Sequence, residues 1–327
     1  MENTKYDVVA LGELLVDFTE NGTSNQGNPI YEANPGGAPC NVLSMLKKLG
    51  HETAFIGKIG NDIFGRQLKK AVSDAGIDVS GLVMDDVVKT TLAFVETKPD
   101  GDRDFSFYRN PGADMMLQPE EVDAELIKKA KIFHMGTLSL THEPVRSATR
   151  RAVQIAKEEG LMVSFDPNIR EPLWESMEDA REQTAYGLSV CDVLKISDNE
   201  IMWFTGEEDF DAGIKKLQEE YQIPLILLSL GREGSRAYLK NSVTEARAEV
   251  PAFVRKDTIE TTGAGDTFGG CCLHYVLEHG EGDVRKVNWK AEDLTEMLTF
   301  ANKAASIITT RKGALAVMPS REEILKA

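Results

Sequence analysis

The sequence has 327 residues, 42% of them hydrophobic and 28% charged, and it carries a formal net charge of −16. This acidic excess argues against nucleic acid as a partner, because a nucleic-acid-binding protein presents a basic face. It is compatible with one bound nucleotide, for which a local loop and a few basic side chains suffice. No apolar run reaches the ~18 residues of a membrane span, and the acidic N-terminus does not resemble a signal peptide. We therefore expect a cytoplasmic protein with no membrane partner.

The spacing of cysteine and histidine predicts neither a disulfide framework nor a metal site. None of the cysteines forms a C-x-x-C pair, which suits a reducing compartment; they are Cys40, Cys191, Cys271 and Cys272. Cys271 and Cys272 fall on the apolar face of a predicted helix and are expected in the core. The histidines show no ligand spacing and are expected to be structural; they are His51, His134, His142, His274 and His279.

Strand patterns dominate the start of the chain. One strand is predicted over residues 6–18, with a break at Gly12, and another over 52–60. Residues 62–75 have a helical pattern that ends at Gly76, a favoured C-cap residue. These elements alone do not yet define a fold.

A β-hairpin is predicted next. Residues 91–97 and 103–109 are rich in strand-forming side chains, and the turn residues Pro, Asp and Gly separate them at 99–102. We expect the sheet-like segments near 13–35 and 88–112 to form a small β-sheet lid on the main body.

From about residue 119, helical patterns alternate with short apolar strands. The helices are predicted at 119–130, 143–159, 178–189, 209–220 and 291–309, and the strands at 131–136, 161–167, 192–197 and 224–231. This alternation predicts an α/β fold with a three-layer, doubly wound, mostly parallel sheet, here as one domain over 1–327. Ligands bind at the carboxyl ends of such strands, where the polar residues are Asp166, Asn168, Arg170, Lys195, Ser197, Ser229 and Arg232.

The segment Thr262-Gly263-Ala264-Gly265-Asp266 carries the strongest functional signal, because a helical pattern starts at its end. Backbone N–H groups at a helix N-terminus bind anions. A carboxylate there would repel an anion unless it served as a base that deprotonates a hydroxyl during phosphoryl transfer. A Walker A motif is missing, and the glycine spacing does not fit a dinucleotide fingerprint. A plain tight turn is the alternative interpretation.

Several motifs together resemble the ribokinase-like (PfkB) carbohydrate kinases, most closely the fructokinases. The resemblance covers nearly the whole chain, and the matching segments are 34–41 (NPGGAPCN), 55–62 (FIGKIGND) with 64–65 (FG), 109–114 (RNPGAD), 166–174 (DPNIREPLW) and 260–266 (ETTGAGD). It implies ATP- and magnesium-dependent transfer of a phosphoryl group to an alcohol, with D-fructose converted to fructose 6-phosphate.

The resemblance also implies roles for individual residues. Asp266 would be the catalytic base, and Gly263, Ala264 and Gly265 would form the anion hole. The sugar would be held by Asp17, Gly36, Gly37, Asn41, Phe107, Arg109 and Arg170. The nucleotide would lie along Lys195, Ser229, Gly231, Gly234, Thr262, Gly265, Asn302 and Ser306. A lid-mediated homodimer would be ordinary for this family.

Two positions depart from the family pattern. Glu260 stands where the family usually has Asp in a monovalent-cation site, and its extra methylene moves the carboxylate by ~1.5 Å. Potassium activation through Glu260 is therefore an expectation to be tested. Glu200 matches the acid that holds magnesium through water, although Ser197 replaces the usual Asn of that motif.

Two other functions remain open at this stage. A kinase for 2-keto-3-deoxygluconate would use Arg109 and Arg170 to bind the carboxylate of its substrate. A catalytically silent sugar-binding sensor would keep the fold without the reaction, although the intact loop and Asp266 speak against it.

Overall fold

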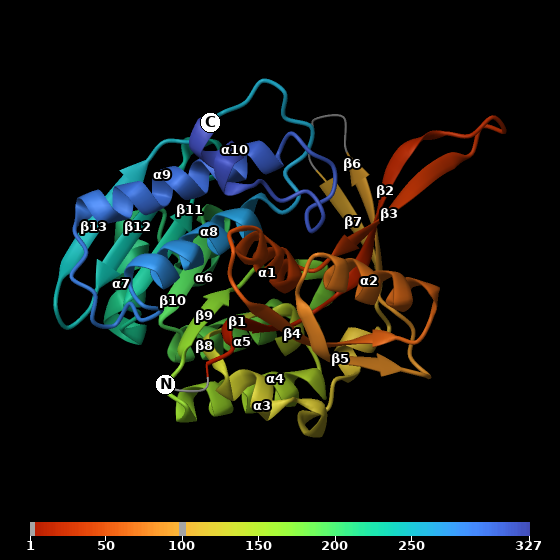
Figure 1. The fold of residues 1–327 in the computed structure, drawn as a ribbon, viewed down its shortest axis with the longest axis horizontal. Coiled ribbons are helices and arrows are strands. Elements are labelled where there is room, and N and C mark those ends of the chain that lie inside the picture. The colour runs from red at the N-terminus through yellow and green to blue at the C-terminus, as the bar shows by residue number, and fades with distance from the viewer. Residues whose placement is uncertain (1–3, 98–102) are drawn as a thin grey trace.

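The computed structural model describes residues 4–97 and 103–327 (Figure 1). A nine-stranded sheet forms its centre, in the order β13-β12-β11-β10-β9-β8-β1-β4-β5. Neighbours from β11 to β5 are parallel, whereas β12 and β13 add an antiparallel edge. The strands are β1 (Tyr6–Leu11), β4 (Thr53–Gly60), β5 (Asp78–Asp85), β8 (Ala130–Gly136), β9 (Met162–Asp166), β10 (Val193–Ser197), β11 (Leu225–Ser229), β12 (Ser235–Lys240) and β13 (Glu245–Val250).

Helices cover both faces of this sheet, which confirms the predicted three layers. Because side chains alternate along a strand, Val8 and Ala10 of β1 join one core cluster, and Val9 and Leu11 join the other. The first cluster includes residues of α1 (Ala38–Lys48), α2 (Ile63–Asp74), α8 (Ala264–His279), α9 (Ala291–Ile308) and α10 (Arg321–Lys326). The second includes residues of α3 (Ala124–Lys128), α4 (Val145–Glu158), α5 (Met177–Val190), α6 (Asp198–Thr205) and α7 (Phe210–Tyr221).

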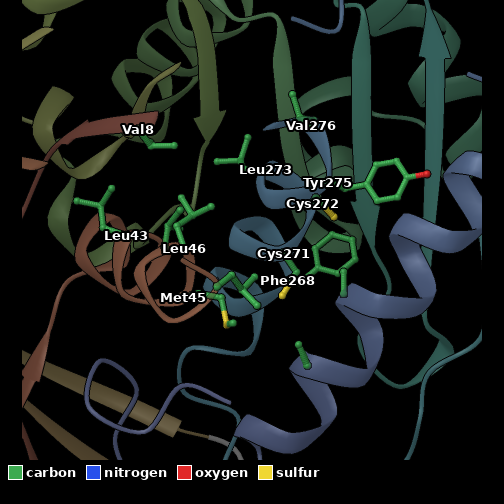
Figure 2. Packing of buried hydrophobic residues seen from close by; sticks show 14 of the residues in the cluster. Val8, Leu43, Met45, Leu46, Phe268, Cys271, Cys272, Leu273, Tyr275 and Val276 are labelled. Carbon is green, nitrogen blue, oxygen red and sulfur yellow. The ribbon is translucent and has the colours of Figure 1, made fainter. Parts of the chain in front are cut away.

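The contact between α1 and α8 fixes the position of the functional loop, because that loop leads into α8. Figure 2 shows Met45 and Leu46 of α1 beside Phe268 of α8. A Cβ atom at Gly270 would lie 2.9 Å from Met45 Cβ, so the two helices approach closely. Cys271 and Cys272 are fully buried here, as predicted.

A separate four-stranded sheet, called the small sheet below, has the order β3-β2-β6-β7. Its strands are β2 (Leu15–Thr23), β3 (Pro29–Gly36), β6 (Leu92–Thr97) and β7 (Arg103–Tyr108). The predicted break at Gly12 divides residues 6–18 between the two sheets. The predicted turn at 99–102 lies outside the described residues.

The predicted helix at 119–130 is wrong. Residues Pro119–Glu121 form a 3-10 turn, and α3 begins only at Ala124. The carboxylate of Asp123 accepts hydrogen bonds from the N–H groups of Glu125 and Leu126 and so caps a new helix. The short turn and α3 are therefore two separate elements. Within residues 4–97 and 103–327, none of the helices combines the length and apolar character that a membrane crossing needs.

Candidate active site

A cavity of about 580 Å³ lies between the small sheet and the carboxyl ends of the parallel strands. Its walls come from the loop before α8, the start of α1, the small sheet and the segments after β9 and β10. A larger cavity, of about 670 Å³, lies at the amino ends of β8 and β9 and is lined by none of the predicted site residues. The first cavity is therefore the candidate site.

The loop before α8 presents two backbone N–H groups at the helix N-terminus. Gly263 has φ 74°, and a Cβ atom there would lie 2.6 Å from Ala314 Cβ, so the turn requires glycine. Ala264 N–H donates to Thr261 O at 3.2 Å and is thus not available to an anion. Among the described residues, no acceptor binds the N–H groups of Gly263 and Gly265. Two of the three predicted amides remain for an anion.

Lys195 adds a positive charge to this anion site. A Cβ atom placed on Gly265 would lie 3.2 Å from Lys195 Nζ. The ammonium group also pairs with Asp166, at 3.0 Å from Oδ2 and 3.1 Å from Oδ1. Burial disfavours the charge on Lys195, but Asp166 and Glu200 outweigh it and raise the pKa of Lys195. The lysine is therefore a fixed cation beside the loop.

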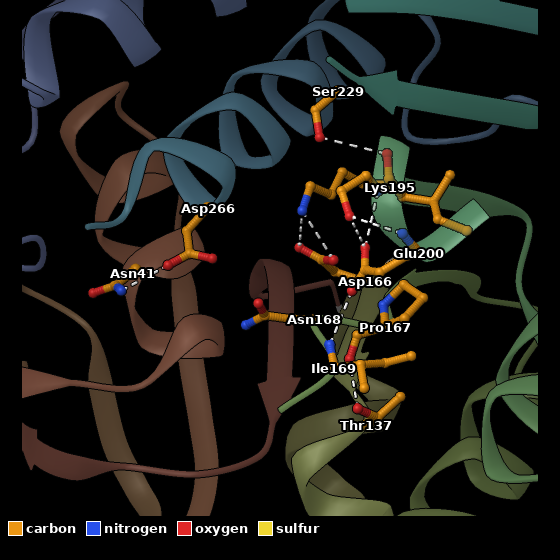
Figure 3. A network of polar contacts seen from close by, with 12 residues as sticks. Asn41, Thr137, Asp166, Pro167, Asn168, Ile169, Lys195, Glu200, Ser229 and Asp266 are labelled. Carbon is orange, nitrogen blue, oxygen red and sulfur yellow. Dashed lines mark hydrogen bonds and ion pairs between the residues drawn. The ribbon is translucent and has the colours of Figure 1, made fainter. Parts of the chain in front are cut away.

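Asp266 lines the cavity in the first turn of α8. Asn41 Nδ2 donates to Asp266 Oδ2 at 2.7 Å and so orients the carboxylate. Burial raises the pKa of Asp266 above its ordinary value, against the hydrogen bond from Asn41 and the charges of Lys195 and Arg170. Figure 3 shows this pair on one side and the Lys195–Asp166 ion pair on the other. An oriented carboxylate with a raised pKa suits a general base.

Glu200 is a further charged residue of the polar network that contains Lys195 and Asp166 (Figure 3). Its Oε2 accepts bonds from Ser197 N–H at 2.9 Å and Ser197 Oγ at 2.7 Å, which caps α6. Its Oε1 accepts one bond, from Ile169 N–H at 2.9 Å. Burial opposes ionisation, but Lys195 and these hydrogen bonds hold the pKa of Glu200 below its usual value. Glu200 is thus ionised and retains acceptor capacity on Oε1.

This combination of fold and site has close counterparts among known proteins. The family model described as pfkB family carbohydrate kinase matches residues 5–321.

The chain belongs to the pfkB family of carbohydrate kinases. It is 40% identical to fructokinase-1 of Zea mays over 323 residues, which is 98% of this chain and 96% of that one. The crystal structure of a fructokinase with bound ATP from Xylella fastidiosa has a TM-score of 0.85 at 30% identity, covering 98% and 97% of the two chains. A double mutant of the Vibrio cholerae O395 fructokinase, in its fructose-, ADP- and potassium-bound form, has a TM-score of 0.85 at 30% identity, covering 99% and 98%.

In this pfkB-family chain, Asp17, Gly37, Phe107 and Arg170 also line the cavity. Asp17 lies in β2, opposite Asn34 of β3. A Cβ atom on Gly36 would lie 2.2 Å from Asp17 Oδ2, so only glycine leaves room for that carboxylate. Gly37 has φ 132°, and a Cβ atom there would meet Glu13 O at 2.5 Å. Gly37 lines the cavity, whereas Gly36 does not line it and instead leaves room for the Asp17 carboxylate.

Arg109 is not part of the cavity wall. Its Nε donates to Asp114 Oδ2 at 2.7 Å, Nη1 to Thr141 Oγ1 at 3.0 Å, and Nη2 to Leu138 O at 3.0 Å. Both side chains of the Arg109–Asp114 pair are only 2% exposed. The prediction of direct substrate contact is therefore corrected, because the guanidinium group is occupied in anchoring the end of β7 to the main body.

Asn302 and Ser306 likewise have partners within the protein and do not line the cavity. Asn302 Nδ2 donates to Val250 O at 3.1 Å, and its Oδ1 accepts from Ser235 Oγ at 2.9 Å. Ser306 Oγ donates to Lys303 O at 2.8 Å. Asn302 thus ties α9 to β12 and β13, whereas the bond of the half-buried Ser306 lies within its own helix. Nucleotide contact by these two residues stays a prediction.

The remaining predicted nucleotide residues divide between the cavity and its surroundings. Thr262 lines the cavity, whereas Ser229, Gly231 and Gly234 do not. Ser229 ends β11 next to Ser197 of β10, which places it near the network (Figure 3). Gly234 has φ 117°, and a Cβ atom there would lie 2.1 Å from Val250 O, so a close backbone approach explains this glycine.

Sequence reasoning missed Glu13 and Asn199 as cavity residues, whereas it expected Asn168 at this edge of the sheet. The Glu13 carboxylate accepts from Ala38 N–H at 2.9 Å, and burial raises the pKa of Glu13 to about 7. Glu13 follows β1, a central parallel strand, so the rule that ligands bind at carboxyl ends of strands could have found it. Asn168 follows β9 in the same way.

Proposed function

We propose that this chain is an ATP-dependent fructokinase that transfers a phosphoryl group to the O6 hydroxyl of D-fructose. The observation that carries the proposal is the cavity in which Asp266 meets the two available N–H groups and Lys195. The identity of 40% to a fructokinase over nearly the full length supports fructose as the sugar.

In the proposed reaction, the O6 hydroxyl of fructose gives its proton to Asp266 as O6 forms a bond to the terminal phosphorus of ATP. The bond from that phosphorus to its bridging oxygen breaks, and ADP leaves. Asn41 fixes the carboxylate for this step. The N–H groups of Gly263 and Gly265 and the Lys195 ammonium stabilise the charge on the transferring phosphoryl group. Phosphoryl transfer depends mainly on such positioning and charge stabilisation.

We assign sugar recognition to the other polar groups of the cavity. Asp17, Asn41 and Arg170 would bind the ring of hydroxyls, with Gly36 and Gly37 allowing close approach and Phe107 covering one side. Buried carboxylates and amides suit a sugar because each accepts or donates several hydrogen bonds. Glu13 joins this group because it also lines the cavity.

The small sheet would act as a lid within a single kinase domain over 1–327, with lid segments at about 13–35 and 88–112. It supplies Asp17 and Phe107 to the cavity. A closed lid would exclude water, which otherwise competes with the sugar for ATP.

The acidic residues of the network fit a magnesium ion, which prefers oxygen ligands and retains bound waters. Glu200 would hold it through water by Oε1, beside Asp166. When bound, magnesium would neutralise charge on the phosphates of ATP. Lys195, Thr262, Ser229, Gly231 and Gly234 would lie along the nucleotide.

Potassium binding at Glu260 remains part of the proposal. Glu260 Oε1 accepts from Gly313 N–H at 3.0 Å, so the longer side chain is held against the turn that follows α9. A potassium-bound fructokinase with a TM-score of 0.85 to this chain supports the assignment.

We also propose a cytoplasmic homodimer formed through the small sheet. Tyr31 and Tyr108 are 42% and 65% exposed there, and both rings lie 5.4 Å from that of Phe94. An exposed aromatic group of this kind suits a protein interface. The four buried free cysteines suit a reducing compartment.

The pH dependence of the reaction tests the proposed base. An aspartate must be ionised to accept a proton, so kcat/KM is expected to fall as the pH drops through the raised pKa of Asp266. The midpoint of this acid limb should lie above the ~3.9 of an unperturbed aspartate. A kcat/KM for fructose that stays constant down to about pH 4, with the fold intact by circular dichroism, would contradict the assignment.

A substrate panel at fixed ATP and magnesium tests the function itself. ADP release should be fastest, measured as kcat/KM, with D-fructose. Faster turnover of 2-keto-3-deoxygluconate would instead assign Arg170 to a substrate carboxylate and overturn the choice of sugar. No ADP release with any sugar, at any magnesium concentration, would favour the sensor.

A further inference from the structure

A second polar cluster lies at the other end of α8 from Asp266. It consists of His51, between α1 and β4, and His274 and Glu278 of α8. One ligand atom from each residue lies within 4.8 Å of the others. His51 and His274 are only 5% and 6% exposed, whereas Glu278 is exposed. We propose that this cluster binds a divalent transition-metal ion of the zinc class.

The arrangement of the two imidazoles points to a bound cation. His51 Nε2 and His274 Nδ1 face each other at 2.7 Å, a distance that requires a proton between their lone pairs. A zinc ion would replace that proton. Zinc–nitrogen bonds of about 2.0–2.1 Å in tetrahedral geometry would place the nitrogens about 3.3 Å apart, a small opening from the observed distance.

Glu278 supplies a third ligand of suitable chemistry. It stands four residues after His274, so both side chains lie on the same face of α8. Two histidines and a glutamate are a known ligand set for zinc, with water as the fourth ligand. Imidazole and carboxylate ligands together favour a transition metal over calcium or magnesium, which take oxygen ligands.

Asp7 provides the outer support that metal-binding histidines usually have. Its Oδ2 lies 3.4 Å from His51 Nδ1, which directs the other ring nitrogen, Nε2, toward His274. Asp7 is itself held by Lys131 at 2.8 Å and by the N–H of Glu52 at 3.0 Å. Such a carboxylate–histidine pair fixes the tautomer and orientation that a metal ligand needs.

A route for the ion exists on the same side of the fold. A cavity of about 570 Å³ between α8, α9 and α10 is lined by His274 and by the carboxylate-bearing residues Glu292 and Glu296. Lys303 and Arg321 line the same cavity and balance these two acids, so the cavity gives an ion access to His274 without attracting it by charge. The proposed site is distinct from the kinase cavity, which has none of these residues in its walls.

Zinc titration of the full-length, chelator-treated protein tests the proposal without nucleotide or sugar. Competition with a chromophoric chelator should show that the wild type binds one equivalent of zinc. Glu278→Gln should weaken this binding strongly. Asp7→Asn should weaken it by about 10–100-fold, the usual effect of losing an outer partner. Cobalt(II) at this site should give the intense visible absorption of a tetrahedral ion.

His279→Gln is the matched control, since His279 adjoins Glu278 but stacks on Tyr275 at 4.1 Å. It should bind zinc as the wild type does. Because Glu278 is exposed, its replacement is not expected to disturb folding, and circular dichroism checks this. Equal zinc affinity and stoichiometry in the wild type and Glu278→Gln would overturn the proposal and leave a hydrogen-bonded histidine pair.

Discussion

Replacing Asp266 by Asn is expected to lower kcat by about 10²–10⁴-fold, the usual contribution of a general base. Asparagine has the size of aspartate and can still accept the Asn41 hydrogen bond through its side-chain oxygen, so the loop and the cavity should persist. Only the capacity to take a proton is lost. Steady-state kinetics with fructose should therefore show a large loss in kcat, and calorimetry should show fructose binding retained.

The matched control is Asp74→Asn, the same exchange on an exposed residue at the end of α2. Its kcat should equal that of the wild type. If Asp266→Asn kept a near-normal kcat, Asp266 would not be the base, and proton removal would have to be assigned to another group in the cavity.

Replacing Asp114 by Ala is expected to destabilise the protein by about 3–5 kcal/mol, because it leaves the buried Arg109 charge without its partner. Both side chains are 2% exposed, and Asp114 also accepts a hydrogen bond from Thr91 Oγ1. The loss occurs where β7 meets the main body. Urea unfolding followed by circular dichroism should show the lower midpoint.

A double variant separates the charge effect from the loss of packing. Combining Asp114→Ala with Arg109→Met removes both charges, and the second change should recover part of the stability lost by the first. If Asp114→Ala alone kept the wild-type midpoint, the pair would not be the anchor of the small sheet that its geometry indicates.

The layered fold could be predicted because its signals are local. Strand and helix patterns alternate after residue 119, and the three layers follow from that alternation. The helix predicted at 119–130 failed for a local reason as well, since Asp123 caps a separate short helix. The antiparallel edge of β12 and β13 was not predicted, because a parallel pattern does not reveal what is added at its edge.

The turn at 262–266 and the helix after it could be predicted because both depend on neighbouring residues in the sequence. The internal hydrogen bonds of Arg109 and Asn302 could not be predicted, since they join residues that are distant in the sequence. Thr141 and Val250, which receive their hydrogen bonds, are 32 and 52 residues away. The pairing of His51 with His274 joins residues 223 positions apart, which no spacing rule detects. Burial, which sets the pKa of Glu13 and Asp266, also comes only from the fold.

In the proposed mechanism, the loop at 263–265 holds the phosphoryl group while Asp266 deprotonates the sugar. A crystal structure with fructose and a non-hydrolysable ATP analogue would show both contacts. We expect fructose O6 within about 2.6–3.2 Å of the Asp266 carboxylate, with the terminal phosphate on the N–H groups of Gly263 and Gly265. A sugar bound with O6 directed away from Asp266, or a terminal phosphate held elsewhere, would contradict it.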